Sequence, residues 1–379
     1  MTTDVDVHLP RDPAADSPAW RAIADLPLKI ESIDGELITA PVGPQLNRKV
    51  TVLHLAGGGG GGDGDGHVGR GEDVTYLTDL QDQLLDHFRT LPLAGTHTIA
   101  SFSALLDELT LIVTGIDGWE QFVDYTRWAF EAAALDLALR QAGISFAQAV
   151  GQPAQPMRWV LSMGLGAPVD CAKVHRWRAA IPGVEFKLDA SDLWTANVCR
   201  ELADTDAIAV VDFKGHYGAA ADWMTNQPTP QTYADVAAHL PGVLLEDAKL
   251  DVDFRAALGD AGLARATWDA PIHSIADIVA FCERAPTSAI NIKPSRFGTL
   301  RELLGAIEHC RTHDLPMYAG GQTELSIGRT QAQTLAACWY ADAGNDLAPV
   351  VFHAASAGDE GLPHGPVVVP DQPGFGFDA

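Results

Sequence analysis

The sequence has few basic residues, and this scarcity excludes several classes of partner. Its 379 residues include 25 Lys and Arg against 50 Asp and Glu, so the formal net charge is −25 at pH 7. A chain this acidic repels the phosphates of nucleic acids and anionic membrane surfaces. The sequence also has no apolar run long enough to cross a bilayer. We therefore expect neither nucleic acid nor a membrane as a partner.

Other signatures are lacking as well. Residues 1–20 have none of the basic, apolar and small-residue regions of a secretory signal, which predicts a cytoplasmic protein. The five cysteines form no CxxC pair, which argues against a disulfide framework or a cysteine zinc site. The run of glycines at 57–62 leads into His67 without the Lys and the Ser or Thr of a phosphate-binding loop. We expect a hairpin tip there.

Apolar residues are plentiful, at 47% of the chain, and they supply a large buried core. Residues 1–25 are polar and contain three prolines, and we interpret them as a flexible arm. Residues 26–127 mix strand and helix patterns, which predicts an α+β domain. A long amphipathic helix follows and is predicted to end at Gly143, because glycine favours the position after a helix. We assign residues 128–355 to a second domain and 356–379 to a tail.

The second domain alternates short apolar strands with helices. Eight such strands over about 200 residues are the pattern of a (β/α)8 barrel. A doubly wound open sheet is the alternative, but no candidate strand is followed by GxGxxG. We therefore predict the barrel. The strand candidates are 158–164, 183–189, 207–213, 242–248, 265–270, 288–294, 315–321 and 349–354.

Charged residues stand at the ends of these strands, where the catalytic groups of a barrel lie. Strands three, four and five supply Asp212, Glu246 and Asp269. Three convergent carboxylates require a cation, and all-oxygen ligation suits Mg²⁺, with Mn²⁺ as an alternative. Lys187 and Lys293, on flanking strands, would be disfavoured as ammonium ions beside a metal and could act as bases near neutral pH. This set predicts proton removal next to a metal-bound carboxylate, with the metal stabilising an enediolate.

Several segments in the same order along the chain carry a family pattern. They are GRGE at 69–72, the helical stretch 131–138, the strand-six segment 292–298, the strand-seven segment 320–329 and the terminal VVVPDQPGFGF at 367–377. Together they resemble the enolase superfamily, and within it the muconate-lactonising subgroup. That subgroup includes o-succinylbenzoate synthases, N-succinylamino acid racemases and dipeptide epimerases.

The resemblance implies a capping domain formed by residues 26–127 together with the tail. It implies that Asp212, Glu246 and Asp269 are the metal ligands, and that Lys187 and Lys293 are an acid/base pair on opposite faces of the substrate. The reaction would be β-elimination (dehydration) by a lyase, or racemisation or epimerisation by an isomerase. The substrate would be a small carboxylate and the assembly a homo-oligomer. Candidate substrate contacts are Asn291, Gly320, Gln322, Glu324 and His353.

The sequence also departs from the family pattern. The second strand has Glu185 in place of a lysine, and the third strand has Lys214 in place of an asparagine. We hypothesise that these two residues form a buried ion pair beside the metal. An alternative is that Lys214 lies near the metal site and weakens its affinity for the cation. Further departures follow Glu246 and Asp269, where Asp247 and Ala270 replace glutamates.

Two other functions remain open at this point. The departures are compatible with a catalytically lapsed barrel that acts as a binding or structural protein. A phosphate-binding barrel would need a glycine-rich loop after strands seven and eight. Gly320 and Gly321 offer slight support for it, but it leaves the three carboxylates unexplained.

Overall fold

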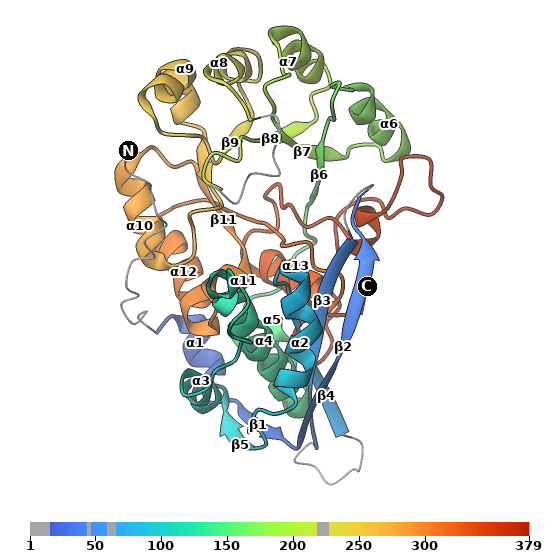
Figure 1. Cartoon of the computed structure of the whole chain (residues 1–379), viewed down its shortest axis with the longest axis vertical. Helices are drawn as coiled ribbons and strands as arrows, with labels where there is room; N and C mark the ends of the chain where they lie inside the picture. Colours follow the sequence, from blue (N-terminus) through green and yellow to red (C-terminus); the bar gives the residue numbers. More distant parts are fainter. Residues whose placement is uncertain (1–15, 44–46, 59–65, 218–226, 379) are drawn as a thin grey trace.

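The computed structural model describes residues 16–43, 47–58, 66–217 and 227–378. The chain forms an α+β domain and a larger domain built on a parallel sheet. In Figure 1 the α+β domain occupies the lower part of the molecule, and the helices that follow the first parallel strands lie at the top. The glycine run of the sequence falls mostly on residues 59–65, outside the described ranges.

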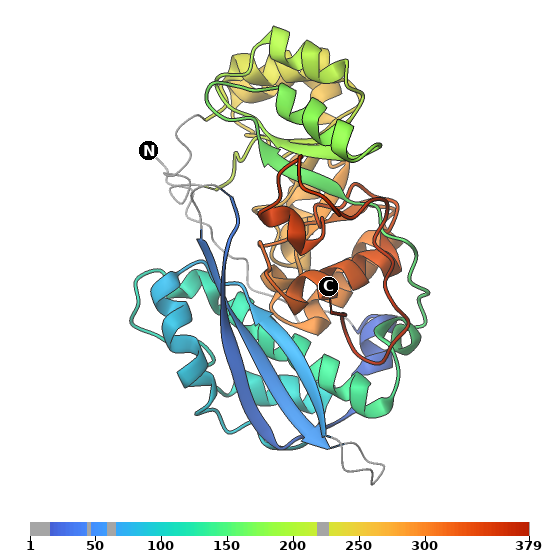
Figure 2. The same ribbon diagram turned by 90° about the vertical axis from the view of Figure 1, so that its right-hand side faces the viewer.

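The α+β domain is centred on an antiparallel sheet of three strands. Two short strands pair beside it, and helices cover one face of the sheet (Figure 2). The elements of this domain are β1 (Pro27–Ile30), β2 (Ser32–Pro41), β3 (Asn47–Gly58), β4 (Gly66–Asp73), α2 (Thr78–Phe88), β5 (Gly95–Thr98), α3 (Ile99–Asp107) and η1 (Trp119–Phe122).

The helix α4 (Val123–Ala142) joins the two domains and is buried along most of its length. It ends where predicted, at Gly143, whose φ of 70° is left-handed. Its backbone lies directly on β4: a Cβ at Gly71 would come within 1.9 Å of the Ala129 carbonyl oxygen. The glycines of the GRGE segment therefore allow a strand and a helix to pack backbone against backbone. The short helix α5 (Phe146–Val150) follows.

The larger domain contains a seven-stranded parallel sheet. Its strands run in the order β12-β11-β10-β9-β8-β7-β6, so neighbours in the chain are neighbours in space. The strands are β6 (Val160–Gly164), β7 (Glu185–Asp189), β8 (Ile208–Asp212), β9 (Leu244–Glu246), β10 (Ala266–Trp268), β11 (Ala289–Ile292) and β12 (Met317–Ala319). The helices are α6 (Ala172–Ala180), α7 (Ala196–Ala203), α8 (Pro230–His239), α9 (Val252–Leu263), α10 (Ile275–Arg284), α11 (Pro294–Phe297), α12 (Leu300–Thr312) and α13 (Ile327–Trp339).

The predicted eighth strand is wrong. Residues 350–353 form the 3-10 helix η3 (Val350–His353) instead, preceded by Pro349. Residues 345 and 346, just before this 3-10 helix, contact both edges of the sheet. Asn345 makes an isolated parallel bridge to Trp159, next to β6, and Asp346 makes one to Gly320, next to β12. The sheet is therefore seven-stranded, and these two residues lie between its edges.

The two ends of the chain also contact the domains. Within the predicted arm, α1 (Pro18–Ile23) is a helix that buries Trp20 and Ile23, and residues 1–15 lie outside the described ranges. The tail returns to the α+β domain, where Arg70 of β4 donates to Asp378 Oδ1 at 2.6 Å. The Phe375 N–H donates to Asp136 Oδ1 of α4 at 2.7 Å. Throughout the described residues, no helix has both the length and the apolar composition needed to cross a membrane.

Candidate functional site

Four carboxylates lie at or just beyond the carboxyl ends of neighbouring strands. Asp189 pairs with Asp212 across β7 and β8, and Asp212 pairs with Glu246 across β8 and β9. Asp269 follows directly after β10. The side chains of Asp212, Glu246 and Asp269 are fully buried. The structure therefore brings the three predicted metal ligands to one end of the sheet.

Lys187 reaches into this carboxylate group from β7. Its ammonium donates to Glu246 Oε1, lies 3.2 Å from Asp212 Oδ2 and lies 3.3 Å from Asp346 Oδ2. Only 2% of the Lys187 side chain is exposed. Asp346 was not predicted, because it comes from the segment that bridges the sheet edges and not from a predicted strand.

Lys293 approaches from the other side. It follows β11, and its ammonium lies 2.8 Å from Asp269 Oδ2. Arg296, one turn further along in α11, donates to Asp269 Oδ1 at 2.8 Å, and the Tyr217 hydroxyl donates to Oδ2 at 3.0 Å. The Asp269 carboxylate therefore contacts two cationic side chains and one phenol. Arg296 is one of these contacts and belongs to the site.

Lys214 also belongs to this site. Its ammonium contacts Asp212 Oδ2 and lies 3.1 Å from Asp189 Oδ1. Its backbone N–H donates to the other oxygen of Asp212, Oδ1, at 2.9 Å. One residue therefore binds both oxygens of a predicted metal ligand.

The hypothesised ion pair between Glu185 and Lys214 is wrong. Glu185 instead accepts two hydrogen bonds from Arg158, at 2.5 and 2.6 Å, and 32% of its side chain is exposed. The reason is position along the strands. Glu185 begins β7, whereas Lys214 lies two residues beyond Asp212, which pairs with the last residue of β7. At about 3.3 Å per residue the two side chains are about 13 Å or more apart along the sheet.

Polar side chains from β11 and β12 donate hydrogen bonds to Glu246. The Tyr318 hydroxyl donates to Glu246 Oε2 and also contacts Thr267 Oγ1 at 2.9 Å. The Asn291 amide donates to the same Glu246 oxygen at 3.3 Å. Tyr318 was missed, although it stands two residues before Gly320 and hence on the same face of its strand.

Asp247 has a positioning role at the same strand end. Its φ of 51° is left-handed, and its carboxylate accepts the backbone N–H groups of Asp269 and Ala270, each at 2.9 Å. These bonds fix the backbone on which the Asp269 side chain stands. Burial, followed by the charges of Asp269 and Asp212, raises the pKa of Asp247 to about 6.

The charges of the site explain the direction of its other pKa shifts. Burial alone would lower the pKa of Lys187, but Glu246, Asp212 and Asp346 outweigh it and raise the pKa well above its usual value. The expectation that Lys187 becomes a neutral base concerns the site with a bound cation, and it stays a prediction. Burial opposes the charged form of Asp269, but Arg296, Lys293 and Lys187 hold its pKa well below the usual range.

The donor set fits a hard divalent cation in its chemistry. Four cationic side chains form ion pairs with five carboxylates here, which leaves a formal excess of one negative charge. The buried Asn291 Oδ1 has no hydrogen-bond partner among the described residues. The atoms that could ligate a cation here, the carboxylate oxygens and Asn291 Oδ1, are all oxygens, as Mg²⁺ prefers. However, no three His, Cys, Asp or Glu side chains in the described ranges are arranged to hold a metal, and ammonium groups stand on the ligand oxygens.

The predicted substrate contacts divide into two groups. Asn291 and Gly320 lie together at the site, since a Cβ on Gly320 would come within 2.4 Å of Asn291 Oδ1. Gln322 instead joins the domains: its amide donates to Tyr125 Oη at 2.8 Å. Glu324 lies 3.2 Å from Arg329 Nη2.

His353 lies on η3 and not on a strand. Its Nε2 accepts from Arg329 at 2.8 Å. Burial, followed by the charge of Arg329, lowers the pKa of His353 to about 4. His353 is therefore a neutral partner of Arg329 in this structure.

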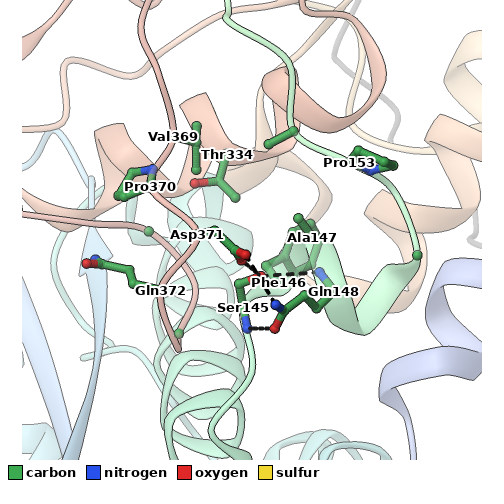
Figure 3. Close-up of a pocket in the computed structure, with 14 residues that line it drawn as sticks. Ser145, Phe146, Ala147, Gln148, Pro153, Thr334, Val369, Pro370, Asp371 and Gln372 are labelled. Carbon is green, nitrogen blue, oxygen red and sulfur yellow. Dashed lines mark hydrogen bonds between the residues drawn. The ribbon is translucent and has the colours of Figure 1, made fainter.

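A cavity of about 490 Å³ lies between α5 and the returning tail. Figure 3 shows the Asp371 carboxylate there, pointing at Ser145 and Gln148. Ser145 Oγ donates to Asp371 Oδ1 at 2.8 Å, and Gln148 Nε2 donates to Oδ2 at 3.3 Å. Among the described residues that line this cavity, Asp371 alone is ionisable, and both of its oxygens are hydrogen-bonded. We therefore place the chemistry at the strand ends.

Solved structures show where this fold occurs elsewhere. A dipeptide epimerase from Methylococcus capsulatus complexed with Mg ion is 18% identical, with a TM-score of 0.67 over 92% of this chain and 99% of that chain. The muconate lactonizing enzyme from Pseudomonas putida is 17% identical, with a TM-score of 0.63 over 92% and 96%. An unknown member of the enolase superfamily from Enterococcus faecalis V583 is 19% identical, with a TM-score of 0.58 over 84% and 86%.

At these identities the likeness shows the fold alone, and it confirms the predicted resemblance at that level. No curated protein sequence matches the chain. Family models do match it: the DUF8230 N-terminal domain covers residues 21–149 and the DUF8230 C-terminal domain covers residues 153–354. The chain has the fold of the enolase superfamily and belongs to the family described as a domain of unknown function, DUF8230.

Proposed function

We propose that this protein is an isomerase or lyase that removes the α-proton of a small carboxylate. The observation that carries the proposal is the placement of two buried lysines. Lys187 comes from β7 and Lys293 follows β11, and the three strands that end in Asp212, Glu246 and Asp269 lie between them. Two amines are therefore available on opposite sides of a substrate bound at the carboxylates.

This geometry supports two outcomes. If one lysine takes the α-proton and the other returns a proton to the opposite face, the substrate is racemised or epimerised. If one lysine takes the proton and the other stays charged as a stabiliser, loss of a β-substituent gives elimination. A lysine must be neutral to accept the proton, and at Lys187 this requires that the surrounding carboxylates be compensated.

In this proposal Asp212, Glu246 and Asp269 hold Mg²⁺, or Mn²⁺ as the alternative. A bound divalent cation supplies the positive charge that stabilises a substrate carboxylate and the negative charge left by proton removal. The excess of negative charge at the site and the all-oxygen donor set support this choice. So does the Mg ion in the dipeptide epimerase of the same fold.

The proposal is tested by exchange of the α-proton in heavy water. The purified protein is incubated with Mg²⁺ and with dipeptides, N-acylamino acids or acid sugars, and deuterium at the α-carbon is measured by mass spectrometry. We expect incorporation into one class, its loss in Lys187→Ala, and its retention in the exposed control Lys29→Ala. Absence of exchange with every class, or exchange that survives in Lys187→Ala, would contradict the proposal.

The second candidate is a catalytically lapsed barrel that binds a ligand without turning it over. It is favoured by one observation: the ammonium groups of Lys187 and Lys214 contact the oxygens that would ligate a metal. Thermal unfolding with and without MgCl₂ separates the two candidates, since a ligand that binds only the folded state raises the melting temperature. An unchanged melting temperature favours the lapsed barrel.

A further inference from the structure

Lys214 holds Asp212 through two different groups. The backbone N–H of Lys214 donates to Oδ1 at 2.9 Å, and its ammonium contacts Oδ2. The Asp212 side chain is fully buried, and 14% of the Lys214 side chain is exposed. A cation can therefore ligate Asp212 Oδ2 only in competition with the Lys214 ammonium, and with the Lys187 ammonium, which lies 3.2 Å from the same oxygen.

The backbone conformation of Lys214 allows both contacts with Asp212. Its φ of 53° is left-handed, a conformation that costs free energy for a residue with a Cβ. The conformation turns the chain immediately after β8, so that the N–H and the side chain of Lys214 return to the same carboxylate. A lysine in this strained position points to a role at the site.

A second carboxylate gives the ammonium another position. Asp189 Oδ1 lies 3.1 Å from Lys214 Nζ, and 39% of the Asp189 side chain is exposed. Asp189 is the register partner of Asp212 on the neighbouring strand, so the two carboxylates stand side by side. The ammonium can therefore leave Asp212 and keep an ion pair with Asp189.

We propose that Lys214 is a tethered competitor for the divalent cation, with its ammonium exchanging between Asp212, where it opposes the cation, and Asp189, where it permits binding. This inference rests on the proposed function, because the cation is the one proposed for Asp212, Glu246 and Asp269. It assigns Lys214 the role of setting the cation affinity. When only a fraction of molecules is competent to bind, the apparent affinity falls by that fraction.

The test is calorimetric measurement of MgCl₂ binding to the full-length protein at constant ionic strength. Lys214→Asn is the appropriate variant, because asparagine tolerates the left-handed backbone and carries no charge. If the ammonium lies on Asp212 in about nine molecules of ten, Lys214→Asn should bind Mg²⁺ about tenfold more tightly. Lys29→Gln removes the same charge from an exposed site and should change the affinity less than about twofold, because that charge is screened.

A double-mutant cycle isolates the part played by Asp189. Asp189→Asn alone should weaken Mg²⁺ binding, because the ammonium loses its alternative partner and stays on Asp212. In the Lys214→Asn background the same change should have much less effect. An equal effect of Asp189→Asn in both backgrounds would show a simple electrostatic influence and would overturn the exchange between the two carboxylates.

The outcomes also separate this inference from the proposed function. If the wild-type protein binds Mg²⁺ and Lys214→Asn binds it no more tightly, the inference fails and the proposed metal site stands. If only Lys214→Asn binds Mg²⁺, the inference is supported in its strongest form. If neither protein binds Mg²⁺, both the inference and the proposed metal site are overturned. Should Lys214→Asn not fold, an unchanged Mg²⁺ affinity in Asp189→Asn would still contradict the inference.

Discussion

Glu72 Oε2 accepts a hydrogen bond from the backbone N–H of Gly328 at 2.9 Å, and this contact joins the α+β domain to the start of α13. The same carboxylate accepts the N–H groups of Leu325 and Ser326 at 2.6 and 3.0 Å. Glu72 is the last residue of the GRGE segment and is fully buried. That segment therefore fixes the loop that follows β12 at the candidate site.

Glu72 makes the stability of the protein depend on pH. Burial, followed by the charge of Glu324, raises the pKa of Glu72 from 4.5 to about 7. The unfolded chain releases this proton at lower pH than the folded protein, so folding becomes less favourable as pH rises through this window. Of the free energy of unfolding, about 3 kcal/mol should be lost between pH 4 and 8 through this group.

The measurement is urea unfolding of the wild type and of Glu72→Gln at several pH values. The glutamine variant lacks the titrating group, so the difference between the two proteins should shift in its favour as pH rises. If that difference stays constant from pH 4 to 8, Glu72 has an unshifted pKa and the prediction is wrong.

Glu185→Ala should have little effect on stability. Its partner is Arg158, and the side chains of the pair are 44% and 32% exposed. Exposed pairs contribute about 0–1 kcal/mol, whereas loss of one partner from a buried pair costs about 3–5 kcal/mol. Urea unfolding of Glu185→Ala therefore separates the surface pair seen here from the buried pair with Lys214 that the sequence suggested. A loss above about 2 kcal/mol would contradict the surface assignment.

The returning tail should contribute strongly to stability through one aromatic ring. Phe375 is fully buried, with its ring centroid 4.8 Å from that of Phe146 and 6.2 Å from that of Trp128. Phe375→Ala removes this ring and should lower the free energy of unfolding by about 3–5 kcal/mol. The exposed Val368, in the same tail, provides the control: Val368→Ala should be nearly neutral. Similar effects of the two changes would argue against docking of the tail.

The seven strands of the parallel sheet could be predicted from sequence, because each is a short apolar run and the runs alternate with helices. The predicted eighth strand was wrong, because a short apolar run such as 350–353 has no periodicity that separates a strand from a helical turn. The true edge contact at Asn345 and Asp346 is made by two polar residues. Such isolated bridges leave no apolar pattern in the sequence.

The sequence predicted most residues of the candidate site, but it did not predict which of them form ion pairs with one another. Alternation along a strand places Glu185 and Lys187 on one face, but it does not show how far along the sheet each side chain lies. Lys187 therefore meets Glu246, whereas Glu185 meets Arg158. The Lys187 ammonium also lies 3.3 Å from Asp346 Oδ2, which is distant in sequence, and no local pattern reveals that contact.

We expect the Lys187 ammonium to balance the negative charge of the site. Lys187→Met removes the ammonium that lies among Glu246, Asp212 and Asp346, and it leaves those carboxylates without that cation. The free energy of unfolding should fall by about 3–5 kcal/mol in the absence of divalent cations. Lys293→Met is the matched comparison.

Lys293→Met should cost less, because Asp269 keeps its contacts with Arg296 and Tyr217. If the carboxylates bind Mg²⁺, the cation restores the missing positive charge, and saturating MgCl₂ should stabilise Lys187→Met more than the wild type. Urea unfolding of the three proteins with and without MgCl₂ measures both effects. Equal losses in the two variants would mean that Lys187 does not balance the charge of the site.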